Sequence, residues 1–289
     1  MTPTHPAPPH TTAASAAVRP AALRVRFRDL LAAEWIKLWS LRSTPWAFGI
    51  GALVVIGINV NAAVSDYNNY PNYPQGTKDL FVPIWAMRDA FTLGAGMVLM
   101  LAAGSIGALA LVGEYSTGQI RTTFAAVPAR RSVVAAKTAV VTAVMLVYGA
   151  FAAAVSFGVT QAVLSGRHVG LPLDYPGALR ATAASALLAP VCALIGMGLG
   201  ALIRHTATTI VTLTGVLLLL PSLINDRNAW SAALLHSLPR GAWDRLTEVG
   251  DSPVPVLYPA TITGAWIVYA AWPLAAAALA TFAVHRRDL

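Results

Sequence analysis

Long uncharged apolar segments alternate with shorter polar segments along this chain. Six of the apolar segments run for at least 19 residues without Asp, Glu, Lys or Arg, over residues 46–64, 91–112, 138–164, 181–203, 206–225 and 261–284. An α-helix rises about 1.5 Å per residue, so each segment is long enough to cross the roughly 30 Å hydrocarbon layer of a membrane. The pattern predicts an all-α, polytopic membrane protein with six transmembrane helices.

The composition supports this fold class and excludes several functions. Hydrophobic residues make up 56% of the chain and charged residues only 11%, with a mean hydropathy of +0.62, whereas a soluble domain is about one quarter charged. The single cysteine, Cys192, lies within the fourth apolar segment, so no disulfide framework or thiol metal site is available. The uncharged spans disfavour an ion-coupled carrier or an intramembrane protease. We therefore expect no catalytic residue, no metal and no cofactor.

The basic residues predict the orientation in the membrane. With both termini inside, the inner segments carry thirteen Lys and Arg residues and the outer segments carry seven. Lys and Arg near the ends of transmembrane helices are retained on the cytoplasmic side. The chain is therefore predicted to be multi-pass with both termini cytoplasmic. The net charge of +8 follows from this topology, and no separate basic domain is present to bind nucleic acid.

The N-terminal residues divide into a tail and an amphipathic helix. Residues 1–21 are rich in Pro, Thr and Ala and cannot bury enough apolar surface to order, which predicts a disordered tail before a membrane domain over 22–289. Within 24–42, apolar residues recur at spacings of three and four, flanked by Arg and Lys and accompanied by Trp35 and Trp39. This pattern predicts an interface helix that lies flat on the inner leaflet.

Glu34 is the unexpected member of this helix, because the 100° step per residue places it among the leucines. One interpretation is a surface contact with Lys37 or Arg42, worth a few tenths of a kcal/mol. The other is a carboxylate turned toward a protein partner or a neighbouring helix. Both interpretations stay open from the sequence.

Residues 113–137 form the main inner loop. A short helix is predicted from Thr117 to Ala126, ended by Pro128, with Arg130, Arg131 and Lys137 at the lipid headgroups. This segment has the character of a docking surface.

Two further patterns concern packing and the outer face. Gly196 with Gly200, and Gly104 with Ala108, are pairs of small residues four apart that let helices approach closely. The outer segment 226–260 holds two weakly apolar pieces, which fit an amphipathic surface loop.

The inner loop and the interface helix together resemble those of ABC-2 type permease subunits of bacterial ABC transporters. The resemblance covers about residues 22–289 and includes the six helices and the inside termini. Its motifs are Glu114-x3-Gly118, Thr122/Thr123, Pro128, Arg131 and Lys137 in the loop, and Glu34-Trp35-Ile36-Lys37-Leu38 followed by Leu41-Arg42-Ser43 in the interface helix.

This resemblance implies the membrane half of an ATP-driven exporter in the bacterial plasma membrane. The chain has no Gly-x4-Gly-Lys-Ser/Thr phosphate loop, so ATP would be bound by a separate ATPase, present in two copies, and the chain itself would not be an enzyme. A second permease, identical or homologous, would pair with it within the lipid. For the outer segment 226–260, the resemblance implies the alternative of a pair of short re-entrant or extracellular helices acting as an outer gate. The residues expected to couple the permease to the ATPase are Glu114, Tyr115, Gly118 and Arg121, supported by Glu34 and Lys37.

A second function remains open beside the exporter. A six-helix membrane protein that does not transport, such as a signalling or assembly factor, could use the same loop to dock a cytosolic partner.

Overall fold

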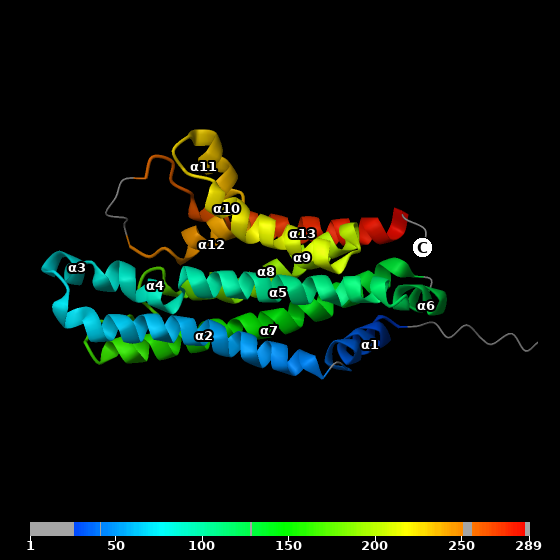
Figure 1. Cartoon of the computed structure of the whole chain (residues 1–289), viewed down its shortest axis with the longest axis horizontal. Coiled ribbons are helices and arrows are strands. Elements are labelled where there is room, and N and C mark those ends of the chain that lie inside the picture. Colours follow the sequence, from blue (N-terminus) through cyan, green and yellow to red (C-terminus); the bar gives the residue numbers. More distant parts are fainter. Residues whose placement is uncertain (1–25, 41, 128, 251–255, 287–289) are drawn as a thin grey trace, which may run out of the picture.

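The computed structural model describes residues 26–40, 42–127, 129–250 and 256–286, and within these ranges the regular structure is entirely helical (Figure 1). The elements are α1 Phe27–Ser40, α2 Ser43–Asn69, η1 Tyr70–Asn72, α3 Gln75–Asp79, η2 Phe81–Trp85, α4 Ala86–Ala90, α5 Leu93–Ser116, α6 Gln119–Ala126, α7 Arg130–Ser165, α8 Ala178–Ile203, α9 Thr206–Thr214, η3 Gly215–Leu219, α10 Leu220–Leu223, α11 Ala229–His236, α12 Pro239–Thr247 and α13 Ile262–Arg286. Six helical stretches of these ranges are long and apolar enough to cross a membrane. The predicted all-α, six-span fold class is confirmed.

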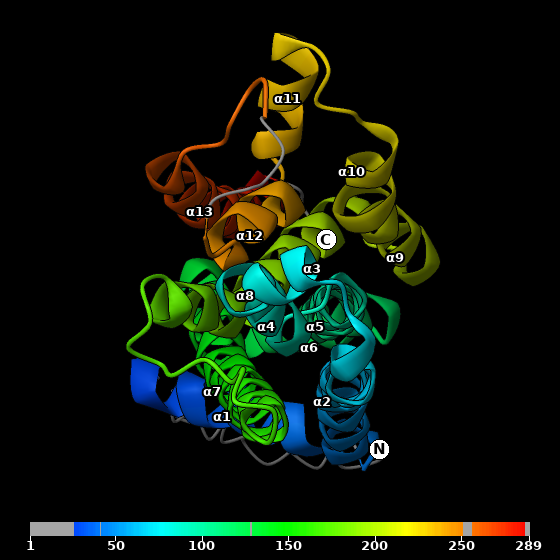
Figure 2. The same cartoon turned by 90° about the vertical axis from the view of Figure 1, so that its left-hand side faces the viewer.

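The long helices run side by side and define two ends of the bundle. The helices α1 and α6 and the last turn of α13 lie at one end, here named the α1 end, and α3 lies at the other, the α3 end (Figure 1). Viewed along the bundle, α1 runs across the ends of α2 and α7 and not parallel to them (Figure 2). A helix placed across the bundle is the arrangement expected of an interface helix. The predicted tail, 1–21, lies outside the described residues.

The first four observed spans are longer than the corresponding uncharged segments. The third runs from Arg130 to Ser165, and the first continues to Asn69 before η1. Eight charged side chains from outside the uncharged segments therefore lie on the spanning stretches: Asp66, Arg88, Asp89, Glu114, Arg130, Arg131, Lys137 and Arg180. The uncharged segments stay free of charge within these helices, and the charged side chains lie beyond the ends of those segments.

The regular α-helix of the fifth span is interrupted just before Pro221. The backbone follows a π-helical pattern over Gly215–Leu219 immediately before α10, which contains Pro221. Proline lacks a backbone N–H and its ring clashes with the preceding turn, so a local change of hydrogen-bond pattern is the expected response. By contrast, α8 and α13 continue through Pro190 and Pro273.

Small residues hold the centre of the bundle together. The central helix α8 contacts α5, α7 and α13. A Cβ atom added to Gly196 would lie 2.0 Å from the carbonyl oxygen of Gly104, and one added to Gly200 would lie 3.2 Å from that of Ala108. The two predicted small-residue pairs therefore face each other across α5 and α8, which confirms their role in close packing.

We predict that Gly107→Ala destabilises the bundle. A Cβ atom at Gly107 would lie 1.9 Å from the carbonyl oxygen of Ala193, so α5 and α8 must separate. Overpacking of this kind costs about 1–3 kcal/mol. Thermal unfolding in detergent, followed by circular dichroism, measures the change. The control is Gly158→Ala in α7, where nothing lies within 4 Å of the added atom. Equal unfolding temperatures for the two variants would contradict the proposed packing.

Candidate functional site

Four charged side chains from three helices meet at the α1 end. Lys37 Nζ on α1 lies 2.7 Å from Glu34 Oε1 and 2.9 Å from Glu114 Oε1, and Glu114 belongs to the last turns of α5. Lys137 Nζ on α7 lies 3.0 Å from the same Glu114 oxygen and also donates a hydrogen bond to Glu34 Oε2. We call these four residues the charged cluster. It joins α1, α5 and α7 through alternating charges.

The charged cluster is largely shielded from water. Glu34 and Lys137 are each 5% exposed and Glu114 is 7% exposed, whereas the side chain of Lys37 is 35% exposed. Burying an isolated charge is costly, and the cost is offset only when opposite charges and hydrogen bonds surround it. Two carboxylates and two ammonium groups balance here, so the cluster holds together as a unit and is destabilised by loss of any one buried member.

Lys37 stays charged in this environment. Partial burial lowers its pKa, but the hydrogen bonds from its ammonium group to Glu34 and Glu114, together with their negative charge, outweigh that effect. The net result is a pKa above the ordinary value for lysine. Lys37 is therefore a fixed positive charge at neutral pH.

Local sequence explains why each member points inward. On α1, Leu30 and Glu34 are the buried residues, four apart on one face, and this helix packs against α7. On α7, the buried residues Val133, Val134, Lys137, Val140 and Val141 follow helical spacing. Lys137 thus occupies a core position of its helix.

Three members of the charged cluster were predicted from the sequence, and one was missed. Glu34, Lys37 and Glu114 were chosen as site residues, and Glu34 is indeed turned toward neighbouring helices as well as toward Lys37. The placement of Lys137 at the headgroups is wrong, because the residue is buried and paired. The helical spacing of Val133, Val134 and Val140 around it was the signal that could have revealed this.

The other predicted site residues lie beside the charged cluster. Tyr115 follows Glu114 directly, and its ring is covered by the guanidinium of Arg204 at 4.7 Å. Gly118 has φ +72°, a left-handed conformation that glycine adopts without strain, and it separates α5 from α6. Arg121 lies on α6, and its side chain is outside the described part of the structure.

The helix α6 was expected over 117–126 and is found over Gln119–Ala126. Ile120 is 3% exposed and Phe124 is 9% exposed, so one face of α6 packs on the bundle, while Thr122 and Ala125 are exposed on the other. This leaves an exposed face on α6 that includes Thr122, eight residues beyond Glu114.

A cavity of about 440 Å³ adjoins the charged cluster. Its walls come from α1, α2, α5 and α7, with residues from the start of α6 at one side. The lining combines the four charged residues with hydroxyl groups and aliphatic side chains, among them Ser43, Thr44, Ile106, Leu109, Val140 and Val141. A volume of this size is within the range of small-molecule binding pockets.

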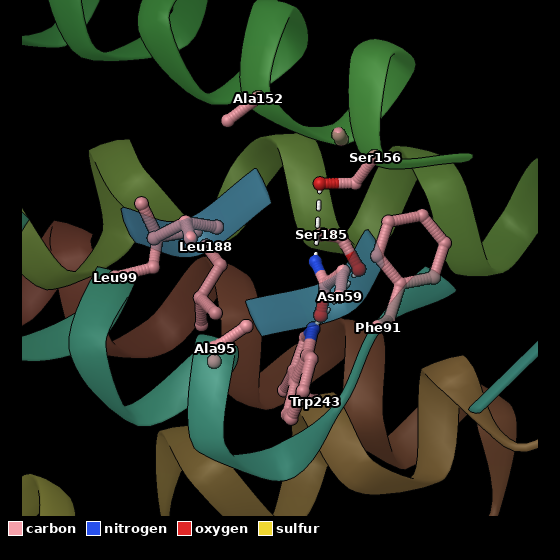
Figure 3. A pocket seen from close by; sticks show the side chains of 12 residues that line it. Asn59, Phe91, Ala95, Leu99, Ala152, Ser156, Ser185, Leu188 and Trp243 are labelled. Carbon is pink, nitrogen blue, oxygen red and sulfur yellow. Dashed lines mark hydrogen bonds between the residues drawn. The ribbon is translucent and has the colours of Figure 1, made fainter. Parts of the chain in front are cut away.

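A second polar site lies nearer the α3 end, where α12 enters the bundle (Figure 3). Asn59 Nδ2 donates to Ser156 Oγ at 3.0 Å, and Thr92 Oγ1 donates to Asn59 Oδ1 at 2.8 Å. Trp243 of α12 donates to Ser185 Oγ at 3.1 Å. The enclosed space is only about 20 Å³, enough for one water molecule. These contacts satisfy buried polar groups and fasten α12 to the spanning helices.

The outer segment 226–260 therefore forms two short helices in its described part. Trp243 is 3% exposed and lies against Gly96, whereas Trp230 on α11 is 72% exposed. The segment is not a simple surface loop, since α12 is packed into the bundle against α8 and α13. Within the described residues, no group of three or more His, Cys, Asp or Glu side chains is placed to hold a metal ion.

We predict that the two lysines of the charged cluster differ in their contribution to stability. Lys137→Met leaves two buried carboxylates with reduced compensation, so the free energy of unfolding should fall by about 3–5 kcal/mol. Lys37→Met should cost less, because Lys37 is partly exposed. Unfolding in detergent measures both, and adding Glu114→Gln to Lys137→Met should restore part of the loss. Equal losses for the two lysine variants would contradict this arrangement.

Comparison with known proteins places these features in a family. The sequence matches the model of the family described as ABC-2 family transporter protein over residues 35–235, which contain Lys37, Glu114 and Lys137 of the charged cluster, α6 and five of the spanning stretches, and begin directly after Glu34. A comparison with curated proteins gives no match. The chain therefore belongs to the ABC-2 transporter family and is a multi-pass membrane permease.

Proposed function

We propose that this permease is the membrane subunit of an ATP-driven exporter, and that the charged cluster couples a separate ATPase to the spanning helices. The observation that carries the proposal is the position of Glu114, which belongs to the cluster and precedes by four residues the Gly118 joint to α6. A force applied to α6 would reach α5 within one helical turn.

The packing of α6 supports this transmission. Its buried face, with Ile120 and Phe124, ties it to the bundle, and its exposed face is available to a partner. From Glu114 the ionic contacts continue to Lys137 on α7 and to Lys37 on α1. Because the four charges share hydrogen bonds, displacement of one helix end would move the other two or break buried pairs.

The separate ATPase is inferred because the chain has no ATP-binding motif of its own. No phosphate-binding loop is present in the sequence, so the energy of ATP would arrive through another polypeptide. We infer two ATPase copies beneath two permeases, identical or homologous. The excess of Lys and Arg in the segments at the α1 end supports a cytoplasmic location for that end and for both termini, in a bacterial plasma membrane. The outward direction of transport rests on the resemblance to ABC-2 exporters.

We infer further that α12 acts as an outer gate. Trp243 fills the space beside Gly96 between the spanning helices, and its indole is held by one neutral hydrogen bond to Ser185. The end of α12 is also held by Arg180 of α8, which donates hydrogen bonds to the carbonyl oxygens of Leu246 and Glu248, so opening would release these contacts together with Trp243. Movement of α12 would open the bundle toward the α3 end.

We predict that Glu114→Gln uncouples the ATPase while leaving the complex assembled. The amide keeps the size of the side chain but removes the charge shared by Lys37 and Lys137. Stimulation of the co-purified ATPase by the permease in proteoliposomes should fall at least about fivefold, the lower end of typical coupling between sites.

The control for this experiment is Asp79→Asn, the same chemical change at an exposed residue of α3 at the far end of the bundle. It should leave stimulation unchanged. An unaltered ATPase rate in Glu114→Gln would overturn the coupling role. Failure of any ATPase to co-purify with the wild-type chain would instead favour the non-transporting alternative.

A further inference from the structure

The cavity beside the charged cluster has two chemically different walls. One is aliphatic and formed by Ile106 and Leu109 of α5 with Val140 and Val141 of α7. The other carries Ser40, Ser43, Thr44, Thr117 and Gln119 beside the charged cluster. A ligand that satisfies both walls needs an apolar body and a polar end.

The four charges of the cluster balance, but the member whose side chain is most exposed is the positively charged Lys37. The side chains of Glu34 and Glu114 are only 5% and 8% exposed, and the oxygens that face the lysines are occupied by them, whereas the side chain of Lys37 is 35% exposed. The N-terminus of α6 adds to this, because Thr117 and Gln119 line the cavity and Gly118 between them offers no capping side chain. Uncapped N–H groups at a helix start favour an anion. The polar end of the ligand should therefore be negatively charged.

The position of the cavity indicates where such a molecule comes from. Its floor is α1, which runs across the end of the bundle (Figure 2) and carries Trp35 and Trp39 with 50% and 37% exposure. Exposed tryptophans of this kind mark the headgroup level of a membrane. A cavity at that depth, with an aliphatic wall on the spanning helices, is within reach of lipid in the adjoining leaflet.

We propose that this cavity binds one anionic phospholipid from the leaflet at the α1 end. The phosphate lies near Lys37 and the start of α6, and an acyl chain lies against the aliphatic wall. The site shares the charged cluster with the proposed coupling, but lipid binding requires only the described helices and the surrounding membrane and no ATPase.

The test is native mass spectrometry of the full chain taken from nanodiscs of phosphatidylcholine and phosphatidylglycerol. The wild type should retain one phosphatidylglycerol per chain in preference to phosphatidylcholine. The double variant Ala47→Phe with Ala110→Phe fills the cavity from α2 and α5 and should reduce this retention about tenfold. The matched control is Leu53→Phe on α2, because Leu53 is 72% exposed and does not line the cavity. This variant should retain phosphatidylglycerol as the wild type does.

A second variant tests the proposal even if the double variant Ala47→Phe with Ala110→Phe does not fold. Lys37→Gln should retain phospholipid without preference for phosphatidylglycerol over phosphatidylcholine, because the exposed ammonium is gone. Wild-type retention that shows no preference for phosphatidylglycerol, or equal retention by the filled variant and the control, would overturn the proposal. Preferential retention of added palmitate over phosphatidylglycerol would overturn the phospholipid as the ligand.

Discussion

Charged side chains buried at the end of a membrane bundle must be paired, because little water is there to stabilise them. In this permease the requirement joins Glu34, Lys37, Glu114 and Lys137 into one balanced unit across α1, α5 and α7. The pairing holds α1 against α5 and α7, and Gly118, four residues after Glu114, separates α5 from α6. The features proposed for coupling and for lipid binding both depend on this arrangement.

The centre of the bundle provides the stiffness that makes such an arrangement useful. Glycine and alanine bring α5 and α8 so close that backbone carbonyls occupy the space of missing side chains, as at Gly107 and Gly196. Closely packed helices shift as bodies and do not deform continuously. A displacement that begins at the charged cluster would thus be carried along α5 toward Gly96, where Trp243 packs against it.

The six spans could be predicted from the sequence because the hydrocarbon layer excludes charge over a fixed thickness. Each span therefore appears as an uncharged run of sufficient length, which can be recognised without knowing the tertiary contacts. The charged cluster could be predicted only in part. Glu34 stood out because it shares a helix face with leucines, but Lys137 follows Arg130 and Arg131 and resembles another headgroup residue. The valines at helical spacing around Lys137 mark its buried face, but the carboxylates that balance its charge come from α1 and α5, and local spacing does not encode these tertiary contacts. The insertion of Trp243 and the cavity were unpredictable for the same reason.

The most direct measurement is the accessibility of α6 in the intact membrane. A cysteine at Thr122, an exposed residue of α6, can be probed with a membrane-impermeant maleimide, while Cys192 is fully buried and gives little background. Labelling should occur only in inside-out vesicles and should be blocked when the ATPase is bound. Labelling in intact cells, or labelling in vesicles that the ATPase does not affect, would contradict a coupling role for this end of the permease.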